Sequence, residues 1–135
     1  MAVAAHSEQV HAGAPKPAAD MTVKLRDFDF PMPSQIKAGQ QVWQIFNEGS
    51  QPHEVNLIKL AEGKTIEDVQ AFLHAPNGAP PFISIGGFQA ITPGQSGWLN
   101  LDLEPGNYVA LCFVPNSETG KPHLEHGMIL PFRVK

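Results

Sequence analysis

The residues best suited to chemistry in this 135-residue chain are a lone cysteine, two histidines and a methionine. Cys112 is the only cysteine; His53 lies upstream of it, and His123 and Met128 follow it. Thiolate and thioether sulfurs are soft ligands that favour Cu(I), and imidazole nitrogens suit copper in either oxidation state. The four side chains are therefore candidate ligands of one copper ion.

The segments that would position these residues have the period of β-strands. From residue 21 onward apolar and polar residues mostly alternate, most clearly over 98–103, and 13 prolines and 12 glycines divide the chain into short pieces. Strands are predicted over 21–30, 41–47, 55–60, 98–103, 107–114 and 128–134, with Ile36 leading into a further turn. Trp98 and Tyr108 are assigned to core packing. The chain is predicted to be all-β, with about seven strands.

One segment, around 65–74, has the pattern of a short helix. Thr65 occupies the N-cap position, and Asp68 replaces the usual Glu or Gln of a capping box. Apolar residues then recur at helical spacing, at Ile66, Val69, Phe72 and Leu73. His74 lies near the helix end, where a cation is favoured, and this explains it more simply than metal binding does. Strands with one inserted helix predict a two-sheet Greek-key β-sandwich or barrel.

Composition restricts the function classes. Nine Lys and Arg against 13 Asp and Glu give a formal net charge of -4, so neither nucleic acid nor an anionic membrane surface is an expected partner. The apolar runs are too short for a transmembrane segment. The motifs of serine hydrolases, phosphate-binding loops and zinc proteases are missing from the sequence, and the chain is not expected to be an enzyme. Asp27 and Asp29 are interpreted as a solvated strand edge rather than an acid/base pair.

Residues 1–20 differ from the rest of the chain. They are rich in Ala and Pro and have no hydrophobic periodicity, which predicts a flexible N-terminal tail before a domain spanning 21–135. The A-V-A at 2–4, before a polar run, resembles the small-residue end of an export signal. The protein is therefore expected to be exported, to the periplasm or outside the cell. His6 and His11, in the tail, are not expected to be ligands.

Three motifs in order resemble those of the cupredoxins, the family of plastocyanin and azurin. IKAGQQVWQIFNEGSQPH, at 36–53, resembles the strand, turn and strand that lead to the family's first histidine ligand. PGNYVALC, at 105–112, resembles the strand that delivers its cysteine. HLEHGM, at 123–128, has its spacing between the second histidine and the axial methionine. The resemblance covers most of 21–135, leaving out the helix and the loop after it.

This resemblance implies that His53, Cys112 and His123 are the strong ligands of one copper ion and that Met128 is a weak axial ligand. It implies a one-electron carrier whose redox partner proteins dock near an exposed histidine edge. A copper carrier or storage protein, which exchanges metal with a donor or acceptor without redox cycling, remains open, and so does a metal-free binding module. Oxidative copper enzymes of this fold need a second, histidine-rich copper site, and the remaining histidines form no such cluster.

Two features depart from the family pattern. Ten residues, 113–122, separate Cys112 from His123, more than is usual, which makes His126 a rival to His123. A long loop adds little closure entropy, so the site is still expected to form. In addition, Glu54 and Phe113 stand where the family often has Asn and a small polar residue that tie the ligand loops together. Such outer groups tune the metal, so no reduction potential is predicted.

Overall fold

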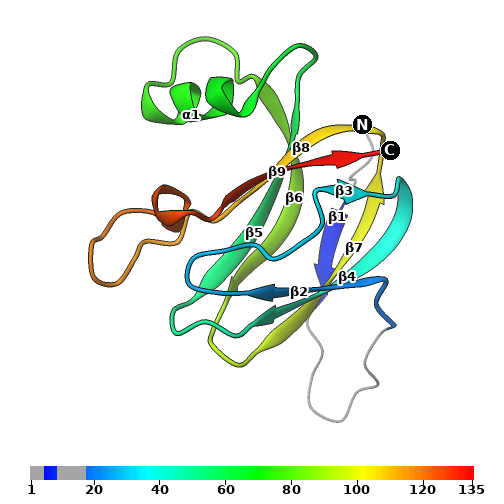
Figure 1. Ribbon diagram of the computed structural model, residues 1–135, viewed down its shortest axis with the longest axis vertical. Helices are drawn as coiled ribbons and strands as arrows, with labels where there is room; N and C mark the ends of the chain where they lie inside the picture. The colour runs from blue at the N-terminus through cyan, green and yellow to red at the C-terminus, as the bar shows by residue number, and fades with distance from the viewer. Residues whose placement is uncertain (1–4, 9–17) are drawn as a thin grey trace.

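Two β-sheets face each other across the core, and one helix lies outside them (Figure 1). The computed structural model describes residues 5–8 and 18–135. The first sheet has the strand order β1-β7-β4-β2, and the second has the order β3-β9-β8-β5-β6. The strands are β1 (Ala5–Glu8), β2 (Met21–Leu25), β3 (Gln35–Ile36), β4 (Gly39–Asn47), β5 (His53–Leu60), β6 (Phe82–Ile91), β7 (Ser96–Leu103), β8 (Gly106–Leu111) and β9 (Ile129–Val134). The predicted all-β sandwich is confirmed.

The strand register of the second sheet brings the candidate ligands to one end. β5 and β8 are antiparallel and pair Asn56 with Leu111, so the start of β5 lies beside the end of β8. β8 and β9 are also antiparallel, so the start of β9 lies beside that same end. His53 begins β5, Cys112 directly follows β8, and Met128 directly precedes β9. Three candidates from distant parts of the sequence thus meet at one edge of the sandwich.

The core between the sheets fixes this edge in place. Trp43 on β4 and Leu57 on β5 are fully buried and belong to one cluster that both sheets share. The Tyr108 and Phe132 rings stack with their centroids 5.4 Å apart. Trp98 is also buried, so both residues assigned to packing do pack. Each such side chain contributes about 1.5–3 kcal/mol by burial, which holds the two sheets together.

Helix α1 (Ile66–His74) forms as predicted and covers the outer face of the second sheet. The Asp68 carboxylate accepts a hydrogen bond from the Thr65 backbone N–H at 2.8 Å, completing the predicted capping box. A second hydrophobic cluster joins the helix to the sheet: Ile58, Val69, Val109 and Leu111, with Leu60, Ile66, Leu73, Phe82 and Ile129 around them. In the described part of the chain, no helix has the length and hydrophobicity needed to span a membrane.

Several elements differ from the sequence prediction. The strand predicted over 21–30 ends at Leu25, and a turn follows that is closed by a bridge between Arg26 and Asp29. β6 was not predicted; its Gly87 passes so near the Val55 carbonyl that a Cβ would collide with it. β1 pairs with β7 from within the predicted tail 1–20, of which residues 1–4 and 9–17 lie outside the described residues. The boundary of the tail therefore stays a prediction.

Candidate metal centre

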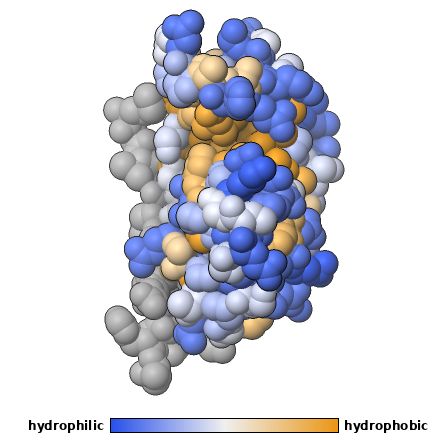
Figure 2. All heavy atoms as spheres, turned by 90° about the vertical axis from the view of Figure 1, so that its left-hand side faces the viewer, coloured by the Kyte–Doolittle hydropathy of each residue, from blue (hydrophilic) through white to orange (hydrophobic). Residues whose placement is uncertain are grey.

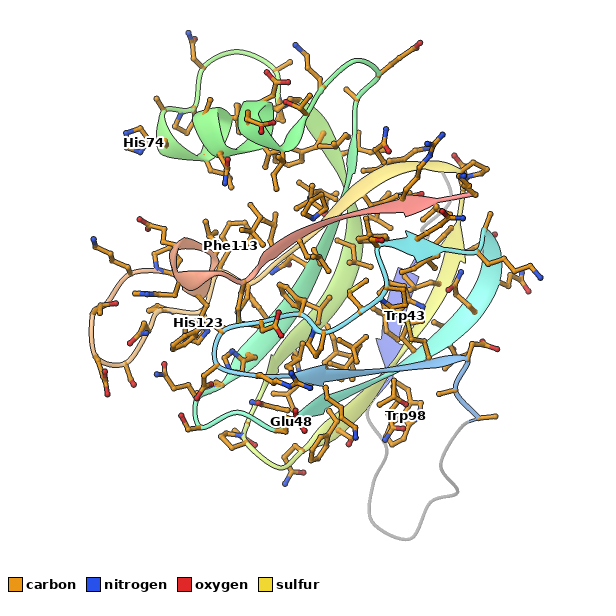
Figure 3. The ribbon with its side chains drawn as sticks, in the orientation of Figure 1. Trp43, Glu48, His74, Trp98, Phe113 and His123 are labelled. Atoms are coloured by element: carbon orange, nitrogen blue, oxygen red, sulfur yellow. The ribbon has the colours of Figure 1, made fainter. Side chains whose placement is uncertain are left out.

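All four predicted ligands lie at the same end of the sandwich and are buried. Each of His53, Cys112, His123 and Met128 has 0% exposure. His123 comes from the 3-10 helix η1 (His123–His126), which follows the long loop after β8 (Figure 3). The ligand atoms of the two histidines and the cysteine all lie within 4.8 Å of one another.

The distances in this cluster suit one metal ion. The Nδ1 atoms of His53 and His123 are 3.1 Å apart, and the Cys112 Sγ lies 3.5 Å from the His123 Nδ1. Two metal–imidazole bonds of about 2.0 Å, the usual length, span 3.1 Å at an angle of about 100°. One N₂S donor set can therefore share a single ion without moving.

Met128 is joined to the other ligands through the backbone. Its N–H donates to the His123 carbonyl at 3.1 Å, and its carbonyl accepts the Cys112 N–H at 3.2 Å. Its side chain packs in the same core cluster as the cysteine. The predicted axial ligand thus adjoins the site, although its binding to metal remains a proposal.

A carboxylate holds the outer nitrogen of the first histidine. The Asp27 Oδ1 lies 2.5 Å from the His53 Nε2, and its Oδ2 accepts hydrogen bonds from the backbone N–H and the hydroxyl of Ser50. Burial would raise the pKa of Asp27, but the hydrogen bonds from Ser50 and His53 outweigh it and lower that pKa to about 2. A Cβ at Gly49 would collide with both Asp27 and His53, so the turn before β5 needs a glycine here.

An amide holds the outer nitrogen of the second histidine. The Gln51 Oε1 lies 3.0 Å from the His123 Nε2 and accepts the Ser117 backbone N–H at 3.0 Å. Because the Ser117 N–H requires an acceptor, this bond fixes which end of the amide faces the imidazole. Burial and then the neighbouring His53 lower the pKa of His123, which favours its neutral form.

These outer contacts determine where the imidazole lone pairs point. An ionised carboxylate and an amide oxygen only accept, so both Nε2 atoms are donors. In neutral imidazoles the lone pairs then lie on the two Nδ1 atoms, which face each other at 3.1 Å. Two facing lone pairs repel unless a cation, a proton or a metal ion, lies between them. The nearby sulfur supplies a third donor, and the arrangement is that of a metal site.

Cys112 is tied to the first ligand turn by two contacts of Glu54. The Glu54 N–H points at the Cys112 Sγ at 3.5 Å, and its Oε1 accepts the Phe113 N–H at 3.0 Å. Burial raises the pKa of the Cys112 thiol in the absence of a metal. The Glu54 and Phe113 pair, which departs from the family pattern, therefore still ties the two ligand loops together.

The loop over 113–122 leaves the sandwich and returns. Pro115 and Pro122 form a bridge across its neck, and the His123 N–H donates to the Val114 carbonyl at 2.8 Å. His126 is not part of the three-residue cluster; its Nε2 lies 2.8 Å from the Thr119 Oγ1. The geometry thus favours His123 over its rival.

The structure refines one interpretation of the sequence and corrects another. Asp27 and Asp29 were assigned to a solvated edge, and both are exposed, but the Asp27 carboxylate also contacts the His53 Nε2. The expected exposed histidine edge is closed, because Asp27 and Gln51 occupy the outer nitrogens of two fully buried imidazoles. No sequence motif marks Asp27 or Gln51, since they act on ligands through contacts that only the fold creates.

Solved structures with the same fold include several copper proteins. Auracyanin from Roseiflexus castenholzii has a TM-score of 0.55 and 18% identity, over 87% of this chain and 99% of that one. Auracyanin A, a blue copper protein from Chloroflexus aurantiacus, has a TM-score of 0.53 and 16% identity, over 84% and 98%. A mutant amicyanin in its Cu(I) form has a TM-score of 0.52 and 18% identity, over 98% and 99%.

No protein-family model and no curated protein matches the sequence. At these identities the structural likeness concerns the fold. The chain has the cupredoxin fold, which auracyanin and amicyanin share.

Proposed function

We propose that this protein binds one copper ion and carries single electrons between redox partner proteins. His53 Nδ1, Cys112 Sγ and His123 Nδ1 would be the strong ligands, and Met128 the weak axial one. The proposal rests above all on the two imidazole nitrogens that face each other at 3.1 Å beside a buried thiol. A bound copper ion would supply the Cu(II)/Cu(I) couple.

The residues of the chain would keep this site the same in both oxidation states. Asp27 and Gln51 fix the two imidazole planes, and Glu54 fixes the cysteine strand. Groups held in this way need little rearrangement when the charge of the metal changes, and burial excludes water. Both properties favour fast electron transfer.

The burial of the ligands also bears on the alternative functions. A copper carrier or storage protein must let a ligand reach the metal, whereas the three ligands of the cluster have 0% exposure. A metal-free module would have no need for two imidazole nitrogens and a thiol placed within 4.8 Å of one another. A second, histidine-rich copper site would be needed for an oxidase; among the described residues, the cluster named above is the one group of its kind. We therefore propose a carrier rather than an enzyme.

Copper titration of the purified chain, followed by visible absorption and electron paramagnetic resonance, tests the site. An intense thiolate-to-copper charge-transfer band should saturate at one equivalent and be lost in Cys112→Ser. His74→Ala is the matched control, because it removes a histidine that lies outside the cluster. His126→Gln should also retain the band.

The redox step has its own readout. The loaded protein should be reduced and reoxidised by one electron over many cycles without losing metal to a chelator. Loss of copper in each cycle would instead support delivery or storage. If neither band nor binding appears, the copper proposal is wrong. The predicted export stays a prediction, since residues 2–4, which suggest it, lie outside the described residues.

A further inference from the structure

The closed histidine edge raises the question of where electrons would leave the site. His53 and His123 are fully buried, and their outer nitrogens face Asp27 and Gln51 rather than solvent. A partner protein therefore cannot contact either imidazole directly. The residue that follows the cysteine offers another way from the site to the surface.

Phe113 provides such a route from the cysteine. It is covalently bonded to Cys112, and its N–H is held by the Glu54 carboxylate. Its side chain is 40% exposed, and only Ile83 joins it among the exposed large hydrophobic residues of the described chain. The ring therefore carries apolar surface to within one residue of a buried ligand.

The Phe113 side chain lines a groove between α1 and η1. This groove has a volume of about 560 Å³, and Leu73 from α1 and Leu124 from η1 supply further apolar walls. Figure 3 shows Phe113 on the side of the η1 loop toward α1. On the same face, Figure 2 shows hydrophobic atoms gathered below the helix. The groove is thus an apolar hollow directly over the cysteine end of the site.

The charges around this hollow indicate what fits it. Besides His74, Glu125 is the one ionisable side chain among its lining residues, and the whole chain carries a net charge of -4 with histidines counted as neutral. Glu54, whose carboxylate holds the Phe113 N–H, adds a second acidic group beside it. An apolar side chain flanked by Lys or Arg would complement both the hollow and its charge.

We propose that this groove is the docking site for a redox protein that presents an apolar side chain surrounded by basic residues, with Phe113 as the contact nearest the copper ligand Cys112. The inference rests on the proposed electron-carrier function and specifies its partner surface. One electron passes from the reduced site to the oxidised partner, and no bond or proton is transferred.

Binding can be tested on the metal-free chain with tris(phenanthroline)chromium(III), a paramagnetic, inert cation with apolar aromatic ligands. Backbone NMR signals of Phe113 and Leu124 should broaden at low salt, while those near Ile83 should not. Gln70→Lys places a positive charge in the groove, where Gln70 is exposed on α1, and should weaken the broadening about threefold or more. Gln70→Glu should strengthen it.

Electron transfer is then measured on the Cu(I) protein with tris(phenanthroline)cobalt(III) as oxidant. Phe113→Ser should slow the reaction about fivefold, as loss of one apolar contact predicts, and Gln70→Lys should slow it as well. Ile83→Ser is the matched control, since it removes the other exposed large apolar side chain of the described residues, on β6, and should leave the rate unchanged.

Broadening elsewhere on the surface, or rates that none of these groove variants changes, would overturn the inference. So would a dimer, seen by sedimentation, that Phe113→Ser dissociates, since the occupant would then be a second copy of the chain. Because the NMR experiment needs no copper, an empty groove overturns this inference even when copper binds. A failed copper titration overturns the proposed function whatever the groove binds.

Discussion

Replacing Asp27 with Asn should raise the reduction potential of the copper-loaded protein. The carboxylate is 2.5 Å from the His53 Nε2, on the opposite side of the ring from Nδ1. A pKa of about 2 keeps it ionised at neutral pH, so its negative charge favours the more highly charged Cu(II) state. Asn keeps an acceptor oxygen but removes that charge.

The size of the effect follows from the distance. The charge lies roughly 7 Å from an ion bound at His53 Nδ1, where a unit charge is worth about 2 kcal/mol at an effective dielectric constant near 20. The Asp27 side chain is 23% exposed, so solvent reduces this to about 1–2 kcal/mol. For a one-electron couple that is a rise of about 40–90 mV.

Spectroelectrochemical titration of the charge-transfer band measures the potential directly. Gln51→Glu is the reciprocal variant, because it keeps the oxygen that faces His123 but adds a charge, and it should lower the potential by a similar amount. Losing a hydrogen bond from Ser50 should cost Asp27→Asn about 1 kcal/mol of unfolding free energy, which urea denaturation checks separately.

Two results would refute this reasoning. One is a potential that stays within about 10 mV of the unmodified protein in Asp27→Asn while the band is retained, because Coulomb's law at this distance forbids so small a change. The other is a shift of the same sign in both variants. That result would mean that distortion of the ligands, and not charge, sets the potential.

Three further predictions concern stability and reactivity. Glu54→Ala should lower the unfolding free energy by about 1 kcal/mol by removing the acceptor for the Phe113 N–H, whereas Glu54→Gln retains most of it, as measured in urea. The hydrogen bond from the Thr65 backbone N–H lowers the pKa of Asp68. The cap therefore stabilises α1 fully above the ordinary carboxyl pKa, and this stabilisation is lost as the pH falls through the lowered pKa. Amide exchange along the helix should show this pH dependence, and Asp68→Ala should abolish the dependence. Because burial raises its thiol pKa and excludes reagents, Cys112 should be alkylated about 100-fold more slowly in the native metal-free chain than in urea.

The elements that the sequence predicted are those with strong local patterns. Alternating leucines over 98–103 correspond to β7, and the Thr65 and Asp68 pair marks the start of α1, because each pattern lies within one element. β6 has no such pattern. It lies at an edge of the second sheet, and its exposed and half-buried residues do not alternate. Its register shifts against β5 explain why a period of two is missing.

Only those site residues whose type indicates metal binding could be predicted from the sequence. Sulfur and imidazole groups are typical copper ligands, so His53, Cys112 and His123 could be selected from residue type and order. Asp27 and Gln51 could not, because carboxylates and amides are common and these two are 26 and 72 residues from the imidazoles they hold. Asp27 and Gln51 contact the imidazoles because the folded chain passes close to the site at these two positions.

These outer contacts carry a consequence for how the site forms. The turn before β5 links the other two segments around the site. Its Ser50 donates a hydrogen bond to Asp27, and its Gln51 accepts one from Ser117 in the long loop after Cys112. Folding of these turns therefore orients both imidazoles before any metal arrives. The same hydrogen bonds cover both imidazoles, so one network of outer contacts both orients the two histidines and keeps a partner protein from touching them.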